Sequence, residues 1–461
     1  MNQIVKRQNN LFILLTTILL ILSSCNQPAS NKNSGYIPMK ERQITFSEKN
    51  HALDNNDNFS PDDKFLCYDT RGTVYNDNLA NCKSIEKVEI KTGVETVIWK
   101  PESITGEYAA PGVAAVSYHP FENKVVFIHG PFLDEVEERG YYGIRNRTGV
   151  EVSADGKQKM IKVDMRDIST ERPTTPGAQR GGTHRHEYSR NGKRIGFTYD
   201  DFLNEDYDRT IGYVEPSNAA PEGYTHYFAV LLKPAKKEES KPGEIEKAYG
   251  DSWVDAEGTR RAFIGKVRAD NGVDYETDLF VAEIPDSVDI TSAFSEYYSD
   301  YPTPPKDIII RRLTYDKQAD GIARSSLNGK QIAFFAPDTK GIKQVFIIPV
   351  VGSDILSDKS DYTKQVTSFE SDAAYIRWHP SNNWIFSITK GNVAATYVGK
   401  GEKFGNTVFL TNDNKDRKQL VISHSGEQIA YGIDLFNREE DKKFTQIFVM
   451  GVDMKKLIEE L

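Results

Sequence analysis

A polar turn, a charged residue and a short apolar stretch recur together seven times along the chain. Each turn carries Ser, Asn, Asp, Pro or Gly, and the stretch after it is rich in aromatic and β-branched residues. The seven copies are residues 59–68, 119–128, 188–197, 255–264, 326–335, 379–388 and 424–431. Such turns suit tight hairpins, and such stretches suit strands that are packed on both faces. The repeat therefore predicts seven small antiparallel sheets, with each turn joining the first two strands of one sheet.

The two ends of the repeat complement each other. The last copy is followed by one further strand, at 445–449, and then by a charged tail. A strand-like segment at 42–46 precedes the first copy and resembles the fourth strands at 312–314 and 365–367. If this segment completes the last sheet, the ring closes and leaves no long exposed sheet edge. We therefore predict an all-β fold, a seven-bladed β-propeller over residues 42–461 whose N-terminal strand completes the last blade.

The N-terminus has the features of an export signal. Lys6 and Arg7 precede an apolar run at 11–22, which is 12 residues long and too short to span a bilayer. The run leads through Ser23 and Ser24 to Cys25, the pattern of a bacterial lipoprotein signal in which the cysteine is lipidated. An ordinary signal peptide with an incidental cysteine is the alternative.

This pattern divides the chain before the propeller into two parts. We expect residues 1–24 to be the signal peptide and residues 25–41 to be a flexible tether that starts at lipidated Cys25. The protein would then lie in the cell envelope, anchored to the outer membrane and facing the periplasm. In an oxidising compartment Cys67 and Cys82 could form a disulfide, and two unpaired, half-buried thiols are the alternative.

The overall charge narrows the choice of partner. The chain has 58 basic and 67 acidic residues, a net charge of −9, which becomes −11 if Lys6 and Arg7 leave with the signal. Binding to phosphate backbones needs a basic face, so nucleic acid is not expected as a partner. A glycan or an envelope protein fits this charge better.

Polar side chains gather at the predicted strand ends of the first three blades, on the face opposite the hairpin turns. Asp69 and Arg71 follow the second strand of blade one, Arg180 precedes the first strand of blade three, and Asp200 ends its second strand. Arginine can recognise a carboxylate through two parallel hydrogen bonds. These four residues are the predicted ligand-binding set. A local ion pair with a neighbouring Asp or Glu is the alternative for the arginines, including Arg185.

Three histidines on the same face form a candidate metal site. His184 and His186 are two residues apart, so in a regular strand both imidazoles would point to one side and could share a metal ion. His129, His51 or Asp200 could supply a third ligand, and we expect His129. Ordinary hydrogen bonds at the start of a strand are the alternative.

The motifs resemble known families at two levels. The turns and fourth strands are similar to the TolB-like propeller repeat over nearly the whole chain that follows Cys25. More narrowly, segments of the chain resemble the uncharacterised family typified by the YidR protein, which has no established reaction. These segments are residues 58–62 with 68–71, 119–120, 126–131, 175–186 and 196–201. The resemblance implies the propeller fold and points to the residues around 180–186 as a site.

A more distant similarity is to the oligogalacturonate lyases. They are seven-bladed propellers that bind manganese through histidines and a glutamine at the channel mouth. Gln179 with His184 and His186 is similar, although the spacing from Gln179 to His184 is longer. The resemblance implies a possible divalent metal, manganese, as cofactor.

Two functions therefore remain open. The first is a lipid-anchored propeller that binds a small ligand, a glycan or a protein partner at its channel mouth. The second is a metal-dependent lyase that cleaves oligogalacturonate or other oligouronides by β-elimination. In the lyase, His129, His184 and His186 would hold the metal and Arg71 or Arg180 the carboxylates. The sequence contains no Gly-x-Ser-x-Gly nucleophile motif and no zinc-protease helix motif.

Overall fold

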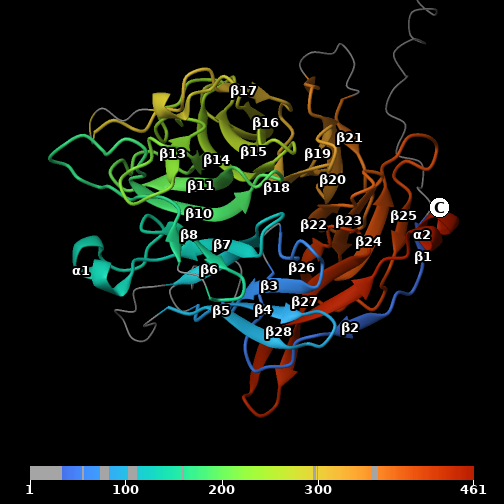
Figure 1. Cartoon of the computed structure of the whole chain (residues 1–461). Coiled ribbons are helices and arrows are strands. Elements are labelled where there is room, and N and C mark those ends of the chain that lie inside the picture. The colour runs from blue at the N-terminus through green and yellow to red at the C-terminus, as the bar shows by residue number, and fades with distance from the viewer. Residues whose placement is uncertain are drawn as a thin grey trace, which may run out of the picture.

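Seven sheets surround a common centre and form a β-propeller (Figure 1). The computed structural model describes residues 34–53, 57–72, 82–101, 112–157, 160–293, 297, 299–354 and 362–461. Strands within each blade follow one another antiparallel from the centre outwards, and the turns of the sequence repeat join the first and second strands. The predicted fold class and blade count are confirmed.

The first three blades occupy the N-terminal part of the ring. Blade 1 contains β3 (Phe65–Asp69), β4 (Ile85–Glu89) and β5 (Glu95–Trp99). Its innermost segment joins β3 only through the isolated bridges Ala52–Asp69 and Phe59–Leu66. Blade 2 contains β6 (Val113–Tyr118), β7 (Lys124–His129), β8 (Thr148–Ser153) and β9 (Ile161–Lys162). Blade 3 contains β10 (Gly181–Tyr188), β11 (Ile195–Asp201), β12 (Thr210–Pro216) and β13 (His226–Val230).

The remaining blades follow in the same order. Blade 4 contains β14 (Ile245–Trp253), β15 (Arg260–Arg268), β16 (Tyr275–Glu283) and β17 (Ile309–Arg312). Blade 5 contains β18 (Asp320–Ser325), β19 (Gln331–Pro337), β20 (Lys343–Pro349) and β21 (Lys364–Gln365). Blade 6 contains β22 (Ala373–Trp378), β23 (Trp384–Thr389), β24 (Asn392–Tyr397) and β25 (Thr407–Phe409). Blade 7 contains β26 (Arg417–Ile422), β27 (Gln428–Asn437) and β28 (Lys442–Gly451).

The N-terminal strand closes the ring as predicted. β2 (Glu41–Gln43) pairs antiparallel with β28 and completes blade 7. The Glu41 carboxylate accepts hydrogen bonds from Arg417 at 2.9 Å and from the Tyr431 hydroxyl at 2.8 Å. These side-chain contacts add to the strand pairing that ties the two ends of the chain together.

The predicted boundary between tether and propeller, at residue 41, is wrong. β1 (Ser34–Tyr36) already belongs to the body, because it pairs in parallel with β25 as a fifth strand of blade 6. Without β1 the outer edge of β25 would present unpaired backbone groups, and pairing satisfies them. Residues 1–33, with Cys25, lie outside the described residues.

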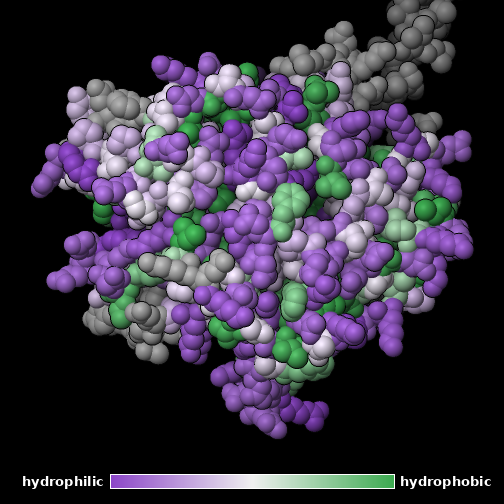
Figure 2. All heavy atoms as spheres, in the orientation of Figure 1, coloured by the Kyte–Doolittle hydropathy of each residue, from purple (hydrophilic) through white to green (hydrophobic). Residues whose placement is uncertain are grey.

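Helices are few among the residues that the structure describes. They are α1 (Val136–Arg139), α2 (Met454–Glu460) and the 3-10 turns η2 (Leu133–Glu135) and η3 (Ile290–Ser292). α2 buries Leu457 against the core of blades 6 and 7. No helix in the described part of the chain has the length and apolar character to cross a membrane. The visible face of the disc is mainly hydrophilic, with scattered apolar residues (Figure 2).

The innermost strands share a local irregularity. In blades 2 to 7 the pairing of the first and second strands shifts at the same place, which marks a β-bulge. A residue with positive φ lies at each bulge: Ala115, Arg185, Gly250, Gly321, Tyr375 and Gln419. A bulge adds a residue on one strand and re-aims the side chains that follow. It therefore decides which side chains the inner strands present to the centre of the ring.

The position just after the bulge is equivalent in blades 2 to 7, and Asn58 takes the same place in blade 1, where its carbonyl accepts from the Cys67 N–H. It precedes the hairpin turn by two residues and pairs with the same place on the second strand. We call this set the channel ring; it comprises Asn58, Ser117, Glu187, Ser252, Arg324, Arg377 and Val421.

Candidate functional site

A cavity of about 150 Å³ lies in the central channel, on the side of the hairpin turns. Six blades contribute to its wall, and channel-ring residues from blades 3 to 6 take part. The charged and aromatic residues among those that line it are Asp57, Phe59, Glu187, Tyr188, Arg190, Trp253, Arg324, Arg377, Trp378 and His424. The candidate site therefore lies on the face opposite to the one that we predicted from the sequence.

Arg324 is the most unusual residue of this wall. Its side chain is 5% exposed, yet none of its three guanidinium nitrogens has a hydrogen-bond partner within the described residues. The nearest carboxylate oxygen, Oε1 of Glu187, lies 3.7 Å from Nη1. Burial, together with the charges of Arg377 and Arg185, holds the pKa of Arg324 well below its usual range. A buried donor group without acceptors is rare in native proteins and calls for a partner.

Glu187 lies closer to a second arginine, Arg261, than to Arg324. Its Oε2 lies 3.1 Å from Nη1 of Arg261, and Arg261 also contacts Asp251 at 2.5 Å. Its backbone carbonyl accepts a hydrogen bond from the indole N–H of Trp253 at 3.0 Å. Glu187 is thus bound by Arg261, a fully buried arginine of the neighbouring blade.

The other charged groups of the wall are also constrained. Arg377 donates from Nη1 to the carbonyl of Ile376 at 2.8 Å, and burial lowers its pKa to about 10. Arg190 bridges towards blade 5, where it donates to the Leu327 carbonyl and the Ser325 hydroxyl. Burial and the charge of Glu187 raise the pKa of Asp57. Arg377 and Arg190 therefore donate to acceptors of the protein itself, unlike Arg324.

Two tryptophans stiffen the wall. Trp253 and Trp378 each follow a channel-ring residue and donate their indole N–H to the channel-ring carbonyl of the preceding blade. The bond from Trp378 to the Arg324 carbonyl measures 2.9 Å. Cross-blade bonds of this kind hold the backbone beneath Arg324 and Glu187 in place, so the arginine cluster sits on a rigid scaffold.

The predicted metal ligands do not come together. Because Arg185 lies in the bulge with a φ of 58°, His184 and His186 are not consecutive side chains on one face of a regular strand. His184 points towards its own blade's second strand, where Nε2 lies 2.8 Å from the Asp200 carboxylate. Its Nδ1 lies 2.9 Å from Arg147 Nη1. Burial and the nearby arginines lower the pKa of His184 to about 3.

The other two histidines have separate surroundings. His186 contacts the Thr183 hydroxyl at 3.0 Å, and its ring fills the space above Gly149 of blade 2. His129 stacks on Phe132, and its Nδ1 contacts the Gly130 carbonyl at 2.6 Å. No group of three His, Cys, Asp or Glu side chains within the described ranges is arranged to hold a metal ion. These donors therefore do not fit the manganese that the lyase resemblance implies.

The four predicted ligand-binding residues are engaged in ion pairs. Arg71 pairs with Asp69 through two hydrogen bonds of 2.8 Å, and Asp69 also accepts the Ala115 N–H of blade 2. Asp200 accepts from Arg209 at 2.7 Å in addition to its contact with His184. Local ion pairing, the alternative for the arginines, is what the structure shows for Arg71.

Arg180, Arg185 and the two cysteines of the predicted disulfide have different surroundings. Arg180 is fully buried and pairs with Asp201 at 2.9 Å, so local ion pairing holds for it as well. Arg185 differs, because its charge acts on Arg324 and Arg377 at the channel. Cys67 and Cys82 are both free and buried, so the disulfide is not formed.

Asp164, which contacts both blade 2 and blade 3, is a buried carboxyl whose protonation is coupled to folding. It accepts hydrogen bonds from the Gly149 N–H and the Thr183 hydroxyl, and burial raises its pKa to about 6. A pKa raised in the folded state adds stability at low pH, which is lost as the pH rises through about 6. We expect Asp164→Asn to remove this loss, so that the variant gains about 1 kcal/mol relative to the native protein between pH 5 and pH 8.

Urea unfolding at pH 5 and pH 8 measures this difference. The exposed Asp270→Asn is the control and should leave the pH dependence unchanged. An Asp164→Asn variant whose stability changes with pH as much as that of the native protein would show that Asp164 is ionised throughout.

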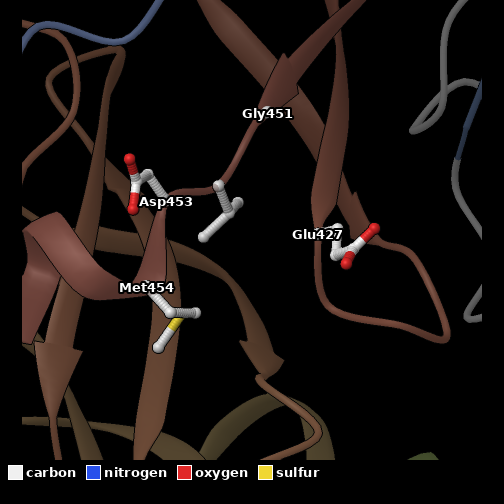
Figure 3. A pocket seen from close by; sticks show the side chains of 5 residues that line it. Glu427, Gly451, Asp453 and Met454 are labelled. Carbon is white, nitrogen blue, oxygen red and sulfur yellow. The ribbon is translucent and has the colours of Figure 1, made fainter.

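A second hollow lies at the end of blade 7 and offers no convergent chemistry. It measures about 520 Å³ and is lined by Glu427, Gly451, Val452, Asp453 and Met454. Figure 3 shows the carboxylates of Glu427 and Asp453 pointing in different directions. Asp453 is occupied in capping α2 through the Lys456 N–H.

Sequence reasoning missed the arginine cluster, although a signal was present. Arg324 and Arg377 each stand two residues before a hairpin turn, at the place that other blades fill with Ser252 or Val421. A charged residue at a repeat position inside the ring is costly unless it binds something. Aligning the repeats on their turns and reading this single column would have found both arginines.

Comparisons with known proteins agree with the resemblance stated above. Residues 112–221 match a family described as "Protein of unknown function (DUF3748)". The chain is 29% identical over 436 residues to the uncharacterised protein YidR of Escherichia coli K12, covering 87% of this chain and 97% of YidR. The predicted resemblance to YidR is confirmed.

Solved propellers are similar in fold at low sequence identity. TolB from Acinetobacter baumannii is 11% identical with a TM-score of 0.36, covering 85% of this chain and 80% of TolB. The oligogalacturonate lyase from Vibrio parahaemolyticus is 9% identical with a TM-score of 0.40, covering 91% of this chain and 98% of the lyase.

Proposed function

We propose that this propeller is a lipid-anchored envelope protein that binds a small anionic ligand in its central channel. The observation that carries the proposal is the Arg324 guanidinium, which is buried in the cavity wall and whose three nitrogens have no hydrogen-bond partner among the described residues. Leaving such a group without acceptors costs several kcal/mol, by the general energetics of buried charges. A carboxylate or phosphate in the cavity would supply them through charge-assisted hydrogen bonds.

The neighbouring residues support binding of an anion. Arg324 offers hydrogen-bond donors and no acceptor, and Glu187, which also lines the cavity, is bound by Arg261. The ligand can be free, or it can be the anionic group of a glycan or a protein partner that reaches the channel from the hairpin-turn face.

A binding experiment with a matched arginine control tests the proposal. Purified protein in a buffer without oxyanions would be titrated with phosphate, sulfate, acetate and galacturonate by calorimetry. We expect at least one of these anions to bind the native protein, and Arg324→Met to weaken that binding about tenfold to a hundredfold, the loss of a charge-assisted contact. Arg438→Met, at an exposed site, should bind as the native protein does.

The stability of the variant separates loss of binding from loss of fold. Arg324→Met leaves Glu187 paired with Arg261 and removes a buried guanidinium that has no hydrogen-bond partner among the described residues. Its unfolding free energy without ligand should therefore equal or exceed that of the native protein. Binding of no anion by the native protein, or undiminished binding by Arg324→Met, would refute the proposal.

The envelope anchor has its own test. The proposal that Cys25 carries the lipid rests on the charged, apolar and small-residue pattern before it. We expect Cys25→Ser to move the protein from the membrane fraction to the soluble periplasmic fraction and to abolish labelling with a fatty-acid probe. Cys82→Ser, which alters a buried thiol of the propeller, should leave both properties unchanged. Membrane-bound Cys25→Ser protein would exclude lipidation at this residue.

A further inference from the structure

The residue that follows the channel ring in each blade gives the cavity an apolar collar. This position is aromatic or aliphatic in every blade except blade 5, which has Ser325 there. It stands one residue nearer to the hairpin turn than the channel ring, so the collar lies between the turns and the ring. The collar residues that line the cavity are Phe59, Tyr188, Trp253, Trp378 and Ile422.

Arg324 belongs to the channel ring beneath this collar. Its guanidinium nitrogens have no hydrogen-bond partner among the described residues, whereas Arg377 and Arg190 donate to carbonyls of the protein. A ligand that enters from the hairpin-turn face therefore passes apolar side chains before it reaches the donors of Arg324. One guanidinium group suits one carboxylate, which it binds through two parallel hydrogen bonds.

Two carboxylates of the protein share the wall with Arg324. Asp57 and Glu187 both line the cavity. A second carboxylate on the ligand would come close to one of them, and like charges that share a site repel each other. A hydrocarbon group on the ligand meets no such repulsion and removes apolar surface of the collar from water.

The size of the cavity limits the ligand further. At about 150 Å³ it is comparable to cavities that hold one benzene-sized molecule, so it accepts on the order of five to eight non-hydrogen atoms. A carboxylate group accounts for three of these atoms. The remainder is enough for a short straight or branched hydrocarbon chain.

From the collar, the guanidinium group beneath it and this volume, we infer that the channel ligand is a small monocarboxylate with a short apolar body. The inference rests on the proposed anion-binding function and specifies its ligand class. The carboxylate would accept hydrogen bonds from Arg324, and the hydrocarbon chain would pack among the collar side chains, Trp253 and Trp378 included.

Four small probes separate the parts of this inference: isobutyrate, acetate, the neutral isobutyramide and the dianion malonate. Calorimetry on the native protein at pH 8 is expected to show isobutyrate binding about tenfold tighter than acetate, because its two methyl groups leave water. Isobutyrate should also bind at least about tenfold tighter than isobutyramide, which lacks the charge, and than malonate, which carries a second carboxylate.

Two variants test the collar and its entrance. Ile422→Ala shortens a collar side chain, and Leu327→Ala shortens a cavity-lining side chain that is 50% exposed, so that folding should not depend on it. We expect each to lower the ratio of isobutyrate to acetate affinity about twofold to fivefold and to leave acetate binding nearly unchanged. Val351→Ala, at a side chain that is 80% exposed and outside the cavity wall, is the control.

The outcomes distinguish this inference from the proposed function. Equal affinity of the native protein for isobutyrate and acetate, or tighter binding of malonate, would overturn the ligand class while anion binding at Arg324 still stands. An unchanged affinity ratio in both folded variants, checked by thermal unfolding, would also overturn it. Absence of binding by every anion would overturn both.

Discussion

Replacing Arg261 by Met is expected to lower the free energy of unfolding by about 3–5 kcal/mol. Arg261 is 1% exposed and lies between Glu187, at 3.1 Å, and Asp251, at 2.5 Å. Its removal leaves two buried carboxylates without their shared cation, and an uncompensated buried charge is among the most costly single changes in a protein core. The methionine fills much of the volume, so the loss reports mainly on charge.

Arg260, the preceding residue, offers a matched control. Its side chain is 40% exposed, and its one ion pair, with Asp255, spans 3.8 Å. Arg260→Met should change stability by less than about 0.5 kcal/mol. Guanidinium unfolding of both variants beside the native protein gives the comparison. A loss below about 1 kcal/mol in Arg261→Met would mean that Glu187 and Asp251 are protonated or find other partners.

The Arg261→Met variant is also expected to bind anions more weakly in the channel. Once Arg261 is gone, Glu187 is free to turn towards Arg324, whose Nη1 lies 3.7 Å away. Anion affinity should therefore fall in any Arg261→Met protein that remains folded, although Arg261 itself does not line the cavity.

Asp201→Asn is expected to cost a similar amount, about 3–5 kcal/mol, at the opposite face. Asp201 and Arg180 are both fully buried, and one carboxylate oxygen accepts from Arg180 and from the Tyr199 hydroxyl. The second oxygen accepts the N–H groups of Leu203 and Asn204. Asparagine keeps the size but loses the charge and one acceptor, so Arg180 would be left buried beside a neutral amide.

A double-mutant cycle shows whether the two residues act together. Combining Asp201→Asn with Arg180→Met should cost less than the sum of the single changes, because the second change removes the charge that the first left unpaired. Asp206→Asn, at a side chain that is 81% exposed, is the control and should be nearly neutral. Additive losses would place Arg180 outside the pair and restore it as a candidate ligand-binding residue.

The fold was largely predictable because its causes are local. Turn residues, alternating strands and a repeated spacing are visible in residues 59–68 as clearly as in 379–388, and each repeat forms its blade with its own neighbours. The closing strand was predictable for a related reason, since an unpaired segment at one end and a missing strand at the other complement each other. No blade of the repeat lacks a strand that β1 would replace, so its parallel pairing with β25 was not predicted.

Spacing could have pointed to the two channel arginines, but it could not show which polar residues are already bound by neighbours, because those contacts are not local. His184 and His186 would lie on one face of a regular strand, but the bulge at Arg185 separates them. Arg71 and Arg180 have the character of ligand-binding residues, yet each finds a carboxylate within its own blade. Histidine and arginine in a motif indicate polar chemistry, and only the surrounding strands decide whether that chemistry is already satisfied.

By itself the sequence determined the number of blades, their order and the way the ring closes, since these follow from short-range patterns of turns and apolar strands. Only the tertiary structure decided how each buried charge is hydrogen-bonded. Arg324 and Arg377 lie in separate repeats, and whether their guanidinium groups are satisfied depends on Glu187, Arg261 and Asp57 from three other blades. Burial and ion pairing are properties of side chains that meet across the ring, so the proposed anion site depends on how the blades assemble around one channel.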